Sequence, residues 1–175
     1  MSFTSVLGIG ILLVVIVLIK KQSLIEMVGS NRVIGINLSE KQWFHHKWMS
    51  GLFLFVLNAI LFSLAVGLIF ASGLLEVPYL HILIMVAATF TSIYFWIVIR
   101  VSVKRAKKDQ LIMGVVGSSF YMILFFVFLY MYITLEPSTP EHDTFMAAIG
   151  LMFGMIVAMV AWVACFVITA FSNKN

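Results

Sequence analysis

The sequence has few charged residues: Asp, Glu, Lys and Arg make up 10% of its 175 residues, whereas 63% are hydrophobic. The mean hydropathy is +1.13. A soluble domain of this length could not bury so much apolar surface. The composition therefore excludes a soluble globular protein and indicates an integral membrane protein built from α-helices.

Cysteine is almost absent, since Cys165 is the single one and lies inside an apolar run. One cysteine can form neither an internal disulfide nor a CxxC redox pair. This excludes thiol-oxidase chemistry by the chain alone.

Acidic residues are missing from the middle of every apolar run, because all seven lie at run ends or in connections. Proton-driven pumps and many ion-coupled carriers use an ionisable group inside the membrane as a relay. The absence argues against that class but leaves open a channel or a substrate site built from backbone groups. The sequence also contains no Walker A loop, GxGxxG or HExxH motif, and no nucleophile–base pairing, so we predict no catalytic residues and no enzyme activity.

Five apolar runs are long enough to cross a bilayer, which takes about 17 to 25 residues. They cover residues 3–19, 49–75, 79–99, 111–135 and 144–171. The first is the shortest, and an interfacial position for it would leave four crossings. It has no preceding positive charge and no small-x-small cleavage site, which indicates an uncleaved anchor rather than a signal peptide.

Lys and Arg are absent from the connections at one end of these runs. The eleven form two clusters and a tail: Lys20, Lys21, Arg32, Lys41 and Lys47; Arg100, Lys104, Arg105, Lys107 and Lys108; and Lys174. Because Lys and Arg are retained in the cytoplasm, the pattern predicts an exported N-terminus and a cytoplasmic C-terminus in the cell membrane. The basic loops are expected to contact anionic lipid headgroups, not nucleic acid.

The same pattern divides the chain into four parts. Residues 1–19 form an anchor span, 20–48 a cytoplasmic segment, 49–171 a four-helix transmembrane bundle, and 172–175 a cytoplasmic tail. Ser39-Glu40-Lys41-Gln42 has the form of a capping box. We therefore expect an interfacial helix over 40–48 that runs without a break into the second span.

Two ladders of small residues predict close helix packing, which drives helix association in lipid. One consists of Ser63, Gly67 and Ala71 in the second span, and the other of Gly150, Gly154 and Ala158 in the fifth. The ladders are expected to pack on each other or on a second copy of the protein. Met152, Met155 and Met159 lie on the opposite side of the fifth span and are interpreted as core filler or lipid contacts.

Mild polar side chains recur at a similar depth, about 12 Å from the cytoplasmic ends of three spans. They are Asn58, Ser92, Ser118 and Ser119. Such a layer either joins helices through hydrogen bonds or forms a polar constriction or small-ligand site. Asn58 is the best anchor for it, because its side chain both donates and accepts.

Two histidines belong to the predicted external face. His81 is followed by Met85, and His142 by Met146. This spacing and the ligand chemistry of His suggest an external metal or haem site, with a pH-sensing role or no role as alternatives. Asp143 or Thr144 is expected to cap the fifth span, which would leave His142 before the helix.

These observations favour a non-catalytic membrane component, acting as an accessory, assembly, regulatory or protective subunit through transmembrane helix contacts. A homo-oligomer or a larger membrane complex is expected, and no cofactor is required. A small homo-oligomeric channel or transporter with a pathway near Asn58, Ser92 and Ser119 is the alternative, and the metal or haem site at His81 and His142 is the third.

Overall fold

The computed structural model describes residues 42–75, 79–103, 105–136 and 144–171, together with a few positions between residues 8 and 23. The helices in the four long stretches are α4 (Gln42–His45), α5 (Lys47–Leu74), α6 (Leu80–Ser102), α7 (Lys107–Ile133) and α8 (Phe145–Ala170). Helices α5 to α8 are each long and apolar enough to cross a membrane. The 28 residues of α5 give a length of about 42 Å, which exceeds a hydrocarbon core of about 30 Å, so the helix tilts or extends into the headgroup region.

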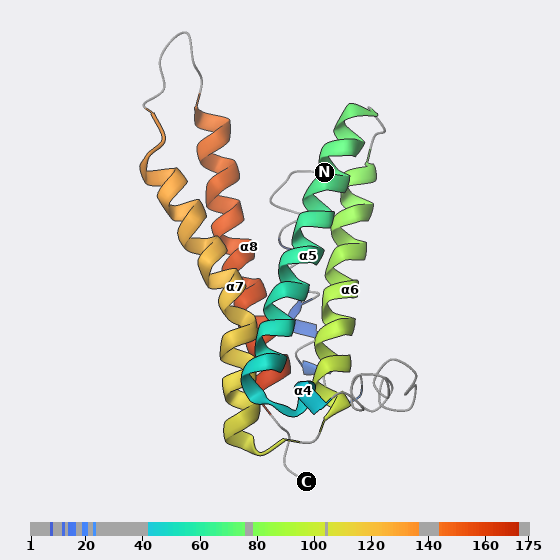
Figure 1. Cartoon of the computed structure of the whole chain (residues 1–175). Helices are drawn as coiled ribbons and strands as arrows, with labels where there is room; N and C mark the ends of the chain where they lie inside the picture. The colour runs from blue at the N-terminus through green and yellow to red at the C-terminus, as the bar shows by residue number, and fades with distance from the viewer. Residues whose placement is uncertain are drawn as a thin grey trace.

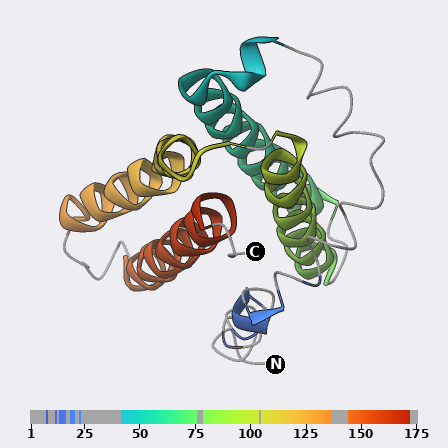
Figure 2. The same ribbon diagram turned by 90° about the horizontal axis from the view of Figure 1, so that it is seen from below.

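The four long helices form two antiparallel hairpins, α5–α6 and α7–α8 (Figure 1). Contacts within α7–α8 are the most extensive, and α5 also packs on α7, while α6 and α8 touch less. Seen along the bundle, α5, α6, α8 and α7 follow one another around it (Figure 2). The short α5–α6 and α7–α8 connections account for this antiparallel order.

The hairpins are joined at one end and diverge toward the other (Figure 1). We call the joined end the basic end, because Lys47, Arg100, Arg105, Lys107 and Lys108 lie where α5 and α7 begin and α6 ends. The core sits in this half of the bundle. Its buried residues are Phe44, Leu54, Ile93, Trp96, Ile97, Ile99, Met113, Tyr121, Ala164, Cys165 and Ile168.

Hydropathy predicts the four described spans to within a few residues at each end. The predicted second, third, fourth and fifth runs correspond to α5, α6, α7 and α8. The first run is described at too few positions to test a fifth crossing. Among those positions, Val14 is helical and packs against the core.

The helix expected over 40–48 is interrupted before the second span. The backbone of His46 is extended, with φ −76° and ψ 124°, so α4 ends at His45 and α5 begins at Lys47. At this interruption, Arg105 Nη2 donates to the Phe44 carbonyl at 2.6 Å. The break between α4 and α5 is therefore accompanied by a hydrogen bond from Arg105, a residue too distant in sequence for the local pattern to reveal the contact.

Thr144 occupies the N-cap position of α8, as one of the two predicted caps. Its hydroxyl does not bond to the helix but donates to the Glu136 carbonyl at 3.1 Å. This bond joins the two ends of the α7–α8 connection. Gln42, the last residue of the predicted capping box, begins α4, whereas residues 39–41 and His142 lie outside the described residues.

Candidate functional site

Asn58 is the centre of a buried polar junction that joins all four long helices. Its side chain, on α5, is fully buried. Trp96 Nε1 of α6 donates to Asn58 Oδ1 at 2.8 Å, and Asn58 Nδ2 donates to the Gly117 carbonyl of α7 at 3.1 Å. Asn58 Nδ2 also lies 3.7 Å from Cys165 Sγ of α8. Because an indole N–H can only donate, Trp96 fixes which end of the amide faces it.

The junction extends toward the bundle centre through Tyr121 of α7. The Trp96 and Tyr121 rings meet edge to face with centroids 6.0 Å apart. Ser92 of α6 lies close enough to the Tyr121 hydroxyl to interact with it. Edge-to-face ring pairs add about 0.5 to 1.5 kcal/mol beyond the area that they bury.

The four residues of the predicted polar layer do not share one environment, because they have different kinds of hydrogen-bond partner in the structure. Asn58 meets the carbonyl of Gly117, and the neighbouring Ser118 is fully buried. Both serines of α7 bond within their own helix: Ser118 Oγ donates to the Val115 carbonyl at 3.3 Å and Ser119 Oγ to the Val116 carbonyl at 2.7 Å. Asn58 thus bonds across helices and Ser92 of α6 lies toward Tyr121 of α7, whereas the two serines of α7 bond within their own helix.

Glycines of α5 and α7 let the helices approach closely around this junction. A Cβ added at Gly51 would lie 2.8 Å from Val116 Cβ, and one at Gly117 would lie 2.8 Å from Leu54 Cβ. At Gly114 it would lie 2.7 Å from Ala170 Cβ of α8. Real side chains do not tolerate such distances, so this packing requires glycine at all three positions.

The predicted ladder of α5 does not pack within the described part of the chain. Ser63, Gly67 and Ala71 are exposed, and an added Cβ at Gly67 meets nothing within 4 Å. This agrees with the low burial of α5, where 11% of the most apolar stretch is buried, compared with 22% in α8 and 28% in α6 and α7.

The ladder of α8 is buried toward the basic end. Gly150 is open, a Cβ at Gly154 would lie 3.1 Å from the Phe128 ring of α7, and Ala158 is 2% exposed. The two ladders therefore do not face each other, and the α8 ladder packs on α7 instead.

Arg105, in the α6–α7 connection, holds the start of the second span. Its guanidinium donates to the Phe44 carbonyl at 2.6 Å and to Met113 Sδ at 3.2 Å, and it lies 5.1 Å from the centroid of the Phe44 ring. Phe44 is fully buried and meets Phe53 edge to face. Burial lowers the pKa of Arg105, and the nearby Asp109 carboxylate raises it, but a guanidinium stays protonated throughout.

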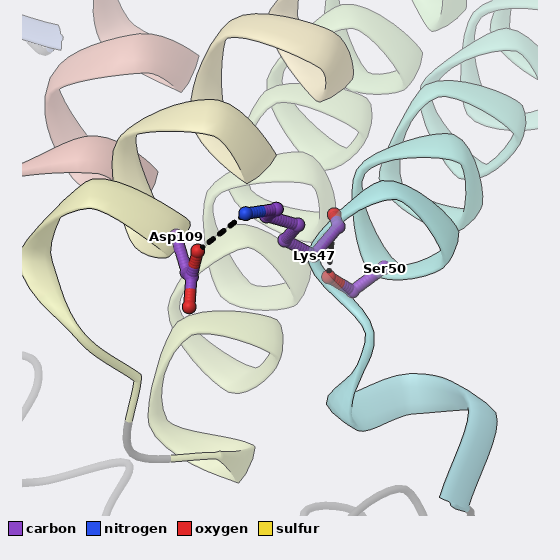
Figure 3. Close-up of polar contacts among 3 residues, drawn as sticks. All are labelled: Lys47, Ser50 and Asp109. Atoms are coloured by element: carbon purple, nitrogen blue, oxygen red, sulfur yellow. Dashed lines mark hydrogen bonds and ion pairs between the residues drawn. The ribbon is translucent and has the colours of Figure 1, made fainter.

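Two further cations of the basic end bond to protein groups. Arg100 Nη1 donates to the Ile168 carbonyl in the last turn of α8 at 2.7 Å, where carbonyls lack helical partners. Figure 3 shows Lys47 reaching from α5 to Asp109 at the start of α7, with Nζ and Oδ1 3.0 Å apart. Ser50 Oγ donates to the Lys47 carbonyl at 3.1 Å. Basic residues expected to set the topology and to contact lipid headgroups therefore also connect separate helices of the bundle.

The structure does not test the predicted external site at His81 and His142, because it describes only one of the two residues. His81 is exposed in the first turn of α6, and His142 lies outside the described part. Within that part, no three His, Cys, Asp or Glu side chains are grouped to hold a metal ion. Met152, Met155 and Met159 line a shallow apolar hollow of about 360 Å³ together with Phe125 of α7.

Sequence reasoning missed Trp96 and the glycines of α7, although both carry a recognisable signal. Trp96 lies within the third predicted span, and a tryptophan that is buried there needs a partner for its indole N–H. The buried residues Gln110, Gly114, Gly117, Ser118 and Tyr121 follow the i, i+4, i+7, i+8, i+11 pattern of one helix face. A small and polar face in an otherwise apolar helix marks the side that meets other helices.

Comparisons with protein-family models, with curated proteins and with solved structures gave no match.

Proposed function

We propose that this protein is a non-catalytic membrane component that works through transmembrane helix contacts, as an accessory, assembly, regulatory or protective subunit. The observation that carries the proposal is the exposed ladder of Ser63, Gly67 and Ala71 on α5, the least buried of the four spans. Elsewhere in the chain, small residues serve as close contact points between helices, as at Gly114 and Gly117. The ladder offers the same kind of surface to a helix of another chain or of a second copy.

The polar residues of the spans support this role more than a pathway. Asn58 uses Oδ1 and Nδ2 in bonds to three other helices, and Ser118 and Ser119 bond to their own helix. Groups that bond to each other in this way join helices and do not replace the hydration shell of a solute. The channel or transporter alternative has no comparable support.

The proposal includes the threading of the chain in the cell membrane. The basic end is cytoplasmic in this proposal, the N-terminus is exported, and the run over 3–19 is a fifth crossing beside the bundle. Support comes from the gathering of Lys and Arg at one end of the bundle and from Val14, which packs against the core. Labelling of single cysteines placed at Lys108 and at Glu136 in intact cells tests the orientation, with only the second expected to react.

The test of the helix-contact role compares two leucine substitutions in α5. Gly67 and Gly73 both have open space around them, but they lie about 120° apart around the helix axis. Gly67→Leu should dissociate the native assembly extracted in mild detergent, whereas Gly73→Leu should leave it intact. A Gly67→Leu variant that stays in an assembly of the wild-type size, in detergent and after cross-linking in membranes, would refute the proposal.

A further inference from the structure

The basic end carries more positive charge than its described protein groups neutralise. Asp109 is the one acidic residue there among the residues that the structure describes, and it is bonded to Lys47. Arg105 bonds to a carbonyl and a thioether, and its buried Nε has no hydrogen-bond partner among the described residues. Lys107 and Lys108 are exposed. Four cations of the basic end therefore have no bonded counter-charge in the described part of the chain. Arg100 bonds to the Ile168 carbonyl at the end of α8, and the other three, Arg105, Lys107 and Lys108, follow one another closely in the chain and form a patch.

This patch lies at the level of a membrane surface. Lys107 and Lys108 are the first two residues of α7, and the apolar membrane-spanning sequence follows from Leu111. Trp48, the second residue of α5, is 56% exposed, and tryptophan is enriched at the headgroup level of membranes. The Lys47–Asp109 contact places the starts of α5 and α7 side by side (Figure 3).

The geometry favours a surface of anions over one small anion. Neighbouring residues of a helix point about 100° apart, so Lys107 and Lys108 reach different places in the plane of the headgroups. The guanidinium of Arg105 already donates to the Phe44 carbonyl and to Met113 Sδ, so it contributes positive charge to the patch and not a free pair of N–H donors. A soluble phosphate would meet a single lysine, whereas a lipid leaflet presents a headgroup to each.

We propose that the patch of Arg105, Lys107 and Lys108 binds anionic phospholipid headgroups of the leaflet around the basic end. The lipids supply the counter-charge that the described protein groups do not. This inference is independent of the proposed helix-contact role, because it concerns the end of the bundle and not the exposed face of α5.

Native mass spectrometry of the full chain in mixed micelles tests the proposal by comparing retained phosphatidylglycerol with retained phosphatidylcholine. The wild type should prefer phosphatidylglycerol. One basic residue near an anionic surface contributes about fivefold, so the double variant Lys107→Gln/Lys108→Gln should lose roughly 25-fold of this preference. Lys107→Arg/Lys108→Arg should keep it.

Several results would overturn the proposal. They are an equal preference of the wild type for both lipids, a similar loss in the double arginine variant, or displacement of phosphatidylglycerol by millimolar inorganic phosphate. If the double glutamine variant does not fold, the wild-type protein alone still tests the proposal. Its preference for phosphatidylglycerol over phosphatidylcholine must fall as the NaCl concentration is raised, because salt screens the attraction. A preference that does not change with salt would contradict an electrostatic site.

Discussion

The indole N–H of Trp96 and the side-chain oxygen of Asn58 are 2.8 Å apart in the buried half of the bundle, and each is the other's partner. The amide nitrogen of Asn58 then bonds to Gly117 and contacts Cys165, so one side chain ties α5 to α6, α7 and α8. In lipid there is no hydrophobic force between helices, and such bonds and close contacts hold a bundle together.

Replacing Asn58 by Leu should destabilise the bundle. The change keeps a similar volume but removes the acceptor of Trp96 and the donor to Gly117. Interhelical hydrogen bonds in membranes contribute about 0.6 kcal/mol on average and up to about 1.7, so we expect a loss of about 1 to 2 kcal/mol. Unfolding in SDS, followed by far-ultraviolet circular dichroism, measures it. Trp96→Phe completes a double-mutant cycle, in which the double variant should lose less stability than the sum of the losses of the two single variants. A loss equal to that sum would mean that the bond between the two side chains contributes nothing to stability.

Adding a single methyl group at Gly114 should also destabilise the protein. The new Cβ of Gly114→Ala would lie 2.7 Å from Ala170 Cβ, so α7 and α8 must separate. Overpacking of this kind costs about 1 to 3 kcal/mol. Gly73→Ala is the matched control, because nothing among the described residues lies within 4 Å of an added Cβ there and Gly73 is not part of the ladder, so it should be neutral or slightly stabilising. Equal SDS midpoints for the two variants would show that α7 and α8 do not approach as closely as described.

Arg105→Lys should loosen the interrupted entry to the second span. A lysine has no planar fork with which to contact the Phe44 carbonyl and Met113 together while lying against the Phe44 ring. Hydrogen exchange measured by mass spectrometry should therefore become faster in α4 and the first turn of α5, and stay unchanged in the middle of α8. Lys107→Arg serves as the control. Unchanged exchange in α4 would mean that Arg105 does not hold it.

The Lys47–Asp109 pair should contribute little to stability. The two side chains are 37% and 43% exposed, and exposed ion pairs contribute about 0.2 to 1 kcal/mol. Lys47→Met should therefore cost less than about 1 kcal/mol in the SDS titration. The cost should shrink further in 0.5 M NaCl, because salt screens exposed charges. A loss larger than that of Asn58→Leu would mean that the ion pair stabilises the bundle more than the buried junction does.

The spans of this protein are predictable because hydropathy is a local property. The bounds predicted for α5 and α8 agree with the structure to within two residues, since each run ends where polar residues begin. The positions of close approach are not local. Gly114 and Gly67 look alike in sequence, yet one meets Ala170 and the other meets nothing.

The basic residues illustrate a second limit. Their distribution predicts the topology, but Arg100 and Arg105 also bond to backbone carbonyls of Ile168 and Phe44, 68 and 61 residues away in the chain. Such contacts form only when the fold brings the end of one helix within reach of a side chain that is distant in the sequence. The break at His46 is of this kind, because it is accompanied by the bond from Arg105 and not by any helix-breaking residue nearby.

The central claim, that the exposed ladder of α5 contacts another helix, is tested most directly by photo-cross-linking in native membranes. A photoreactive amino acid in place of Leu64, which is 58% exposed and flanks the ladder, should form a protein adduct of defined mass. The same amino acid in place of Phe126, which is 57% exposed on α7, should react mainly with lipid. A Leu64 probe that reacts with lipid alone would contradict the account.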